Sequence, residues 1–193
     1  MKSVCVFSDP EAMAREIAFQ WQEHSGQAEK DGRIFSVVLS GGNTASRLYR
    51  QLAERNYADR IPWYAVHIFW ADERCVPPDS EESNYGSCTH FLLNHIPIPK
   101  ENIHRIRGEE DPATESARYA QEIQNHMVVR KGQTAFFDWT LLGVGSDGHT
   151  ASLFPGQGLL NSPNLCEEVR HPQTGQMRIT LTPLAIRRSN RIT

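Results

Sequence analysis

An apolar run passes directly into a glycine turn at Ile34-Phe35-Ser36-Val37-Val38-Leu39-Ser40-Gly41-Gly42-Asn43-Thr44. The triplet Val37-Val38-Leu39 is typical of a strand buried on both faces, as in a parallel sheet. The two glycines allow the backbone to turn tightly, and residues 45–55 then predict a helix. A buried strand, a tight turn and a helix form the first part of a βαβ unit, so this segment predicts a parallel sheet.

The same alternation continues along the chain. Apolar runs rich in β-branched and aromatic residues predict further strands at Val4–Phe7, Val66–Trp70, Ile103–Ile106, Trp139–Leu142 and Arg178–Thr182. Helices are predicted from Pro10, with Ser8 or Asp9 as the cap, at Asn84–Leu93, and from Pro112 onward. The last helix is expected to turn one face to the core, formed by Ala113, Ala117, Ala120, Ile123 and Met127.

This pattern predicts one α/β domain over residues 1–193. We expect a doubly wound, mostly parallel sheet with helices on both faces, in a Rossmann-like arrangement of three layers. Ligands of such folds bind beyond the carboxyl ends of the strands, near a switch in strand order.

The composition excludes several classes of protein. Hydrophobic residues make up 39% of the 193 residues, which excludes a disordered, collagen-like or coiled-coil chain. The net charge of −3 argues against a nucleic-acid partner. Apolar runs fall far short of the roughly 20 residues of a membrane helix, and no signal peptide is visible. We expect a cytoplasmic protein without a membrane partner, either a monomer or a small homo-oligomer.

Metal-binding patterns are absent from the sequence. No set of His, Cys and Asp has the spacing of a zinc site, so no metal is expected. His67 is interpreted as a core or sheet-face residue, and His24 and His126 as exposed helix residues. The cysteines are scattered and are expected to be unpaired thiols, at Cys5, Cys75, Cys88 and Cys166.

Three polar loops follow predicted strands, at Ser40–Thr44, Ala71–Ser83 and Gly143–Thr150. In the first loop, glycines and the amides that open the next helix favour an anion, and the hydroxyls of Ser40 and Thr44 could add donors. This loop matches neither a P-loop nor a GxGxxG fingerprint, and a capped turn without a ligand stays an alternative.

The second and third loops contain charged side chains. Arg74 follows two acids that could position it, and its guanidinium suits a phosphate or an oxyanion; a solvated charge cluster is the alternative. Asp147 and His149 lie among glycines, which suggests an orienting carboxylate and a general base rather than a turn Asp beside a surface His. A GxSxG nucleophile elbow is absent, and Ser83-Asn84 is either a helix cap or a ligand contact.

Together these loops resemble the 6-phosphogluconolactonase family, within the superfamily that includes glucosamine-6-phosphate deaminase. The matching stretches occur in the family's order, at Leu39–Thr44, Trp70–Pro77, Glu82–Gly86, Leu141–Gly156 and Arg178–Thr182. The resemblance implies hydrolysis of 6-phospho-D-glucono-1,5-lactone to 6-phosphogluconate, in the pentose phosphate pathway, with no metal or organic cofactor.

The resemblance also implies a role for each site residue. His149 would activate the attacking water, Asp147 would help to position it, and Arg74 would bind substrate and stabilise the oxyanion. Asn84 would support the loop from Asp72 to Arg74. The set that would bind substrate and its phosphate is Gly41, Gly42, Asn43, Thr44, Asp72, Asn84 and Arg178.

The chain departs from the family pattern at two places. Asn43 and Ala45 stand where the family usually has Ser and often has Pro, and we expect a modest effect on phosphate affinity. Arg191–Thr193 resembles the beginning of a strand, after which the family continues for several more elements. We therefore expect a domain shortened at its C-terminal end, with the phosphate site and the sheet incomplete there.

Two other functions compete with lactone hydrolysis. A sugar-phosphate isomerase-deaminase of the same fold has a Glu shortly after the His, whereas residues 150–158 contain no acid. A non-catalytic sugar-phosphate sensor would not need Arg74, Asp147 and His149 together. The first comparison favours the hydrolase. In the second, the three residues favour the hydrolase, whereas the shortened C-terminal end favours a sensor or an inactive truncated paralogue.

Overall fold

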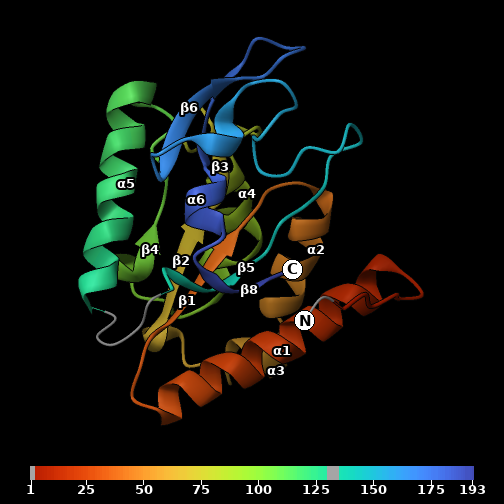
Figure 1. Cartoon of the computed structure of the whole chain (residues 1–193). Coiled ribbons are helices and arrows are strands. Elements are labelled where there is room, and N and C mark those ends of the chain that lie inside the picture. Colours follow the sequence, from red (N-terminus) through yellow and green to blue (C-terminus); the bar gives the residue numbers. More distant parts are fainter. Residues whose placement is uncertain (1–2, 130–134) are drawn as a thin grey trace.

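The computed structural model describes residues 3–129 and 135–193 (Figure 1). The helices are α1 (Pro10–Lys30), α2 (Asn43–Leu52), α3 (Arg55–Ala58), α4 (Asn84–Phe91), α5 (Pro112–Val129) and α6 (Pro183–Ile186). The strands are β1 (Phe35–Leu39), β2 (Val66–Trp70), β3 (Asp72–Arg74), β4 (Ile103–His104), β5 (Phe137–Thr140), β6 (Cys166–Arg170), β7 (Met177–Leu181) and β8 (Ser189–Ile192).

A five-stranded parallel sheet forms the centre of the fold. Its strand order is β4-β2-β1-β5-β8, and every neighbouring pair is parallel. All five residues of β1 are buried, as expected for the central strand of a sheet covered on both faces. Figure 1 shows α5 on one side of this sheet and α2 on the other, with α1 packed against α2, which confirms the predicted α/β class.

The strand order reverses beside β1. The chain runs outward from β1 to β2 and β4, and then returns to the other side of β1 to form β5 and β8. Since β1 lies between β2 and β5, the loops that follow these three strands leave the same edge of the sheet side by side. This edge is the switch point at which ligands of such folds bind.

A second sheet is antiparallel and contains three strands in the order β3-β7-β6. The strand predicted at Arg178–Thr182 therefore forms, starting one residue earlier at Met177, but outside the parallel sheet. Its register places Arg74 directly opposite Arg178 and Asp72 opposite Thr180. Strand β3 follows β2 after a single residue, so this sheet adjoins the carboxyl end of β2.

The predicted strand at Val4–Phe7 is wrong. These residues have no strand partner among the described parts of the chain, and Val4 and Val6 are 90% and 89% exposed. Strand preference depends on packing against neighbours, which this segment lacks. The helix that follows begins as predicted, because the Asp9 carboxylate accepts a hydrogen bond from the Ala12 amide and Pro10 occupies the first turn.

The buried face of α5 differs from the predicted face. Ala113 and Ala117 are exposed and Ala120 is half-buried, whereas Ile123 is buried as predicted. Met127 lies outside the residues whose side chains are described. The helix is rotated so that it buries Glu115, Tyr119, Ile123 and His126. Glu115 and Tyr119 can occupy this face because they are hydrogen-bonded there. His126 is also buried and is not the exposed residue that the sequence indicates.

Tyr119 joins α5 to the end of β2. Its hydroxyl donates to the Trp70 carbonyl oxygen at 2.9 Å and accepts from the Trp70 amide at 2.8 Å. Both partners are fully buried, and burial raises the pKa of the Tyr119 hydroxyl, so it keeps its proton at neutral pH. This contact fixes the last residue of β2 just before the second polar loop.

The Tyr119→Phe variant is expected to unfold more easily. Loss of the hydroxyl leaves a buried amide and a buried carbonyl without their partner, which costs about 1–3 kcal/mol. Urea denaturation measures this loss, with Tyr64→Phe as the control because Tyr64 is 64% exposed. Equal midpoints for the two variants would contradict the assigned role of Tyr119.

Candidate active site

A pocket of about 210 Å³ lies at the carboxyl edge of the parallel sheet. All three predicted loops and strand β7 contribute to its wall. Of the predicted site residues, seven line it: Gly41, Gly42, Asp72, Arg74, Asn84, His149 and Arg178. Ser40, Gly143, Val144, Gly145 and Ala151 complete the described lining.

The first loop approaches the second through its backbone. A Cβ built on Gly41 would stand 1.8 Å from Asn84 Oδ1, so only glycine allows this contact. Gly42 has φ +93° and precedes α2 without a side-chain cap, which leaves the first amides of this ten-residue helix near the pocket. Ser40 is not a spare donor here, because its hydroxyl donates to the Leu141 carbonyl at 2.8 Å.

Two arginines face each other across the pocket wall. Arg74 and Arg178 are opposite residues in the β3–β7 pair, and the Nε of each is buried without a hydrogen-bond partner among the described residues. Burial, followed by the charge of Arg74, lowers the pKa of Arg178. Like charges at opposite positions destabilise a sheet. An anion between the two guanidinium groups would relieve this repulsion.

Buried acids support this arginine pair. The Asp72 carboxylate accepts from the Ser152 hydroxyl at 2.7 Å, and Arg178 Nη1 lies 4.0 Å from it. The Asn84 side-chain amide donates to the Asp72 carbonyl at 2.9 Å. The side chain of Asp72 therefore has partners within the pocket wall, and the Asn84 amide is hydrogen-bonded to the start of the loop from Asp72 to Arg74.

Glu73 fixes the start of α4 against β3. Its carboxylate accepts from the amides of Arg74, Asn84 and Tyr85, each at 2.8 Å, and from the Ser83 hydroxyl at 3.0 Å. Burial raises the pKa of Glu73, and these hydrogen bonds oppose the increase. Ser83 also caps α4 by accepting from the Gly86 amide at 2.9 Å. The cap reading of Ser83 is confirmed, and Glu73 emerges as the residue that organises the second loop.

The third loop places Asp147 against His149. Their carboxylate oxygen and Nδ1 are 2.5 Å apart, and hydrogen bonds from His149 lower the pKa of Asp147. An ionised Asp147 assigns the ring proton to Nδ1, so Nε2 is the nitrogen that can accept a proton. His149 lines the pocket, whereas Asp147 stands behind it.

The backbone of this loop is tightly constrained. A Cβ on Gly145 would stand 2.3 Å from His149 Cε1 and 2.9 Å from Asp147 Oδ1. Gly148 has φ +86°, and Ala151 has φ +49°, which costs a non-glycine residue about 1–2 kcal/mol. Such strain clusters at functional sites, so Ala151 is a feature that the residue types alone did not indicate.

Three predicted residues or contacts fall outside the pocket wall. Asn43 and Thr44 do not line it, and Thr44 lines an adjoining apolar cavity of about 220 Å³ that shares Ser40, Gly41 and Gly143 with the pocket. Asp147 reaches the pocket only through His149. Conversely, sequence reasoning assigned no role to Ser152 or Phe154, although Phe154 contacts the His149 ring with centroids 4.8 Å apart. Both lie in the stretch that carries the family resemblance, and no local pattern distinguishes them.

Known proteins match this chain over most of its length. A curated 6-phosphogluconolactonase from Haemophilus influenzae is 46% identical over 157 residues, covering 81% of this chain and 66% of the relative. A curated 6-phosphogluconolactonase from Nostoc is 36% identical over 183 residues, covering 94% of this chain and 74% of the relative.

Solved structures confirm the fold. The crystal structure titled devB protein superposes with a TM-score of 0.90 at 41% identity, covering 97% of this chain and 76% of that one. The 6-phosphogluconolactonase from Thermotoga maritima gives 0.80 at 27% identity, covering 96% and 79%. A monomeric glucosamine-6-phosphate deaminase, at 19% identity and a TM-score of 0.82, covers 99% and 80% and shares the fold alone.

Some curated relatives are considerably longer than this chain, which spans 66% of the Haemophilus influenzae protein. The described helices are not long and apolar enough for any of them to cross a membrane. The family model for glucosamine-6-phosphate isomerases and 6-phosphogluconolactonases matches residues 8–193. This chain is therefore a member of the glucosamine-6-phosphate isomerase and 6-phosphogluconolactonase family.

Proposed function

We propose that this chain hydrolyses 6-phospho-D-glucono-1,5-lactone to 6-phosphogluconate. One observation carries the proposal: the pocket joins a histidine held by a carboxylate to two arginines whose Nε groups have no partner among the described residues. A base and paired cations are what lactone hydrolysis on an anionic sugar requires. Curated relatives named 6-phosphogluconolactonase support the choice of substrate.

The histidine supplies the base. His149 Nε2 takes a proton from water, and the resulting hydroxide attacks the lactone carbonyl carbon at C1. Asp147 holds the ring by its Nδ1 and stabilises the positive charge that forms on it. When the ring C–O bond breaks, the proton on Nε2 passes to the departing oxygen. A lactone is an activated ester, so this reaction needs no intermediate in which the substrate is covalently bound to the protein.

The arginines and the first loop bind the negative charges. Arg74 stabilises the oxyanion that develops at the carbonyl oxygen, and Arg178 acts on the phosphate with the amides of Gly41 and Gly42. Asn43 and Thr44 complete this site in the proposal through the amides that open α2. Phosphate binding far from C1 holds the reacting carbon near His149, which converts binding energy into orientation.

Isomerisation or deamination of an amino sugar phosphate fits the pocket less well. Asp72 is the one carboxylate among the described lining residues, and it is occupied by Ser152 and Asn84. The described part of the wall therefore contains no second acid that could transfer a proton. A sensor without catalysis would not require the Asp147–His149 contact.

Replacement of the base tests the mechanism. The His149→Ala variant is expected to lose about 10²- to 10⁴-fold in kcat, because general base catalysis supplies this much. The measurement follows lactone opening after subtraction of the spontaneous rate, with the exposed His95→Ala as control. Near-normal turnover in folded His149→Ala protein would exclude His149 as the base.

Replacement of one arginine tests the phosphate site. The Arg178→Met variant should lose roughly 10- to 100-fold in kcat/KM for the phosphorylated lactone, since hydrogen bonds to charged groups contribute about 1.5–3 kcal/mol. Unphosphorylated gluconolactone should be hydrolysed at a nearly unchanged rate. The exposed Arg187→Met is the control. Equal losses for both lactones would argue against phosphate binding by Arg178.

A single methyl group tests the loop geometry. In Gly145→Ala the new Cβ meets the His149 ring, so the ring must move away from Asp147. A displacement of about 1 Å costs roughly 10²-fold in rate, and kcat should fall with little change in thermal stability. Gly26→Ala is the matched control, because a Cβ there meets nothing within 4 Å. Full activity of Gly145→Ala would show that the His149 position is not critical.

A further inference from the structure

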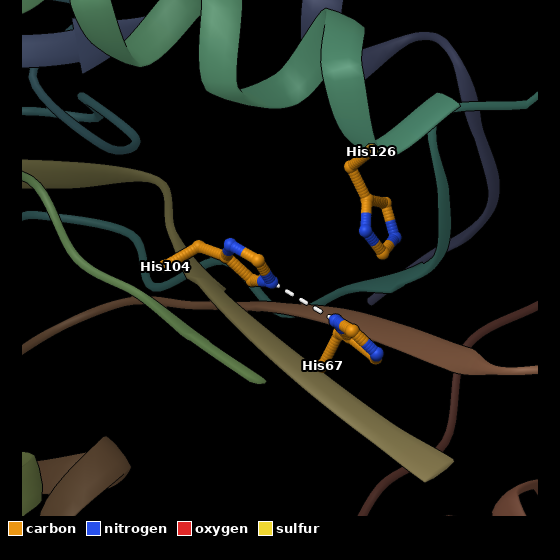
Figure 2. Close-up of side chains that lie close together, drawn as sticks. All are labelled: His67, His104 and His126. Atoms are coloured by element: carbon orange, nitrogen blue, oxygen red, sulfur yellow. Dashed lines mark hydrogen bonds between the residues drawn. The ribbon is translucent and has the colours of Figure 1, made fainter. Parts of the chain in front are cut away.

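Three histidines from separate elements converge on the α5 side of the parallel sheet. His67 belongs to β2, His104 to β4 and His126 to the last turns of α5 (Figure 2). One nitrogen from each ring can be chosen so that all three atoms lie within 4.8 Å of one another. Figure 2 shows the rings of His67 and His104 joined by a hydrogen bond, with His126 reaching toward them from the helix.

The rings are held in place by their surroundings. His67 Nδ1 and His104 Nε2 are 2.9 Å apart, and His104 Nδ1 lies 2.7 Å from Glu122 Oε1. Phe69 stacks on His104 with centroids 4.3 Å apart and also contacts His126 at 4.9 Å. Residues 67 and 69 are two positions apart on β2, so their side chains lie on the same face of the sheet, toward α5. Phe69 therefore forms an apolar wall beside the three nitrogens.

We propose that His67, His104 and His126 bind one divalent transition-metal ion, with Zn²⁺ as the best match. Three imidazoles with one remaining position form a common zinc ligand set, and imidazole nitrogen suits ions of intermediate softness. A Zn–N distance of about 2.0–2.1 Å places tetrahedral ligand nitrogens about 3.3 Å apart. The 2.9 Å between His67 Nδ1 and His104 Nε2 is close to this spacing. The 4.8 Å limit for the three chosen nitrogens leaves at most about 1.5 Å for the rings to close on an ion.

Glu122 completes the site from behind. A carboxylate that accepts the other N–H of a ligating histidine fixes its tautomer and raises its basicity. Glu122 accepts a hydrogen bond from His104 Nδ1 in this way, so the lone pair of His104 Nε2 can bind the ion. When the ion binds, the proton on His67 Nδ1 moves to His67 Nε2 or to solvent.

The proposed metal site opens toward solvent, and a bound ion would link three elements of the fold. His104 and Glu122 line a cavity of about 690 Å³ that is separate from the candidate active site. His67 precedes the carboxyl end of β2 by three residues, or about 10 Å of strand. A bound ion would therefore join the two-residue edge strand β4 and the end of α5 to β2, without entering the lactone pocket.

Metal titration of the metal-free chain tests the proposal. Isothermal calorimetry with Zn²⁺ is expected to show one equivalent bound, and Zn²⁺ should raise the melting temperature. Cu²⁺ in place of Zn²⁺ should give an electron paramagnetic resonance spectrum with coupling to several imidazole nitrogens. His104→Gln and His126→Asn are expected to lose both effects, and Glu122→Gln should weaken binding by about 10- to 100-fold.

Two control variants make the result specific. The exposed His90→Ala should bind Zn²⁺ as the unchanged chain does. His149→Ala should also bind it, because the active-site histidine lies outside the cluster. Circular dichroism of the metal-free protein, recorded in the presence of a chelator, identifies any cluster variant that fails to fold. The metal binding of the other cluster variant then tests the proposal. Absence of stoichiometric binding, binding undiminished in folded cluster variants, or loss of binding in His149→Ala would each overturn the proposal.

Discussion

The pairing of β1 with β2 on one side and β5 on the other is the constraint on which the rest of the structure depends. In-register parallel pairing places Leu39 beside Trp70 and Val38 beside Thr140. The ladder continues one residue further, since the Ala71 amide donates to the Leu39 carbonyl and the Leu141 amide to the Val38 carbonyl. The loops that follow β2 and β5 therefore each begin one strand spacing, about 5 Å, from the loop that follows β1, although tens of residues separate the three loops in the chain.

The second sheet then turns this edge into a charged pocket. Because β3 follows β2 almost immediately, its pairing with β7 places Arg74 and Arg178 opposite each other over the first loop. The resulting repulsion is offset by buried acids, with Asp72 facing Arg178 and Glu73 holding the start of α4. A protein that served stability alone would avoid placing two guanidinium groups, each with a buried Nε, at opposite positions. Their retention is understandable if an anionic ligand supplies the missing charge.

The two groups of histidines lie at different positions along the strands of the parallel sheet. At the carboxyl edge, His149 stands on a glycine-rich loop with its ring partly exposed and its partner two residues away. Farther back along β2, three rings pack between the sheet and α5 beside Phe69. The partly exposed position of His149 suits proton transfer to a bound molecule. The packed position of the three rings suits a structural role, in which they join α5 to the edge of the sheet. The hydroxyl of Tyr119 fastens the same helix to the other end of β2.

Much of the fold could be predicted from local pattern. Three local signals each predicted the element that forms, because each depends on residues close together in the chain. These signals are the buried runs at β1, β2 and β5, the caps at Asp9 and Ser83, and the glycine loops. The failures at Val4–Phe7 and at the inner face of α5 have one cause. An apolar run becomes a strand only beside a partner, and a helix buries whichever face its tertiary hydrogen bonds require.

The amino-acid sequence by itself determined the α/β class, the three converging loops and the Asp147–His149 pair, because strand burial, turn chemistry and a two-residue contact depend on neighbouring residues. Only the tertiary structure decided that Arg178 opposes Arg74, that Ser152 holds Asp72, and that His67, His104 and His126 meet. Each of these contacts joins residues at least 22 positions apart in the chain. They exist because strand register and helix packing, which no local pattern encodes, bring distant segments together.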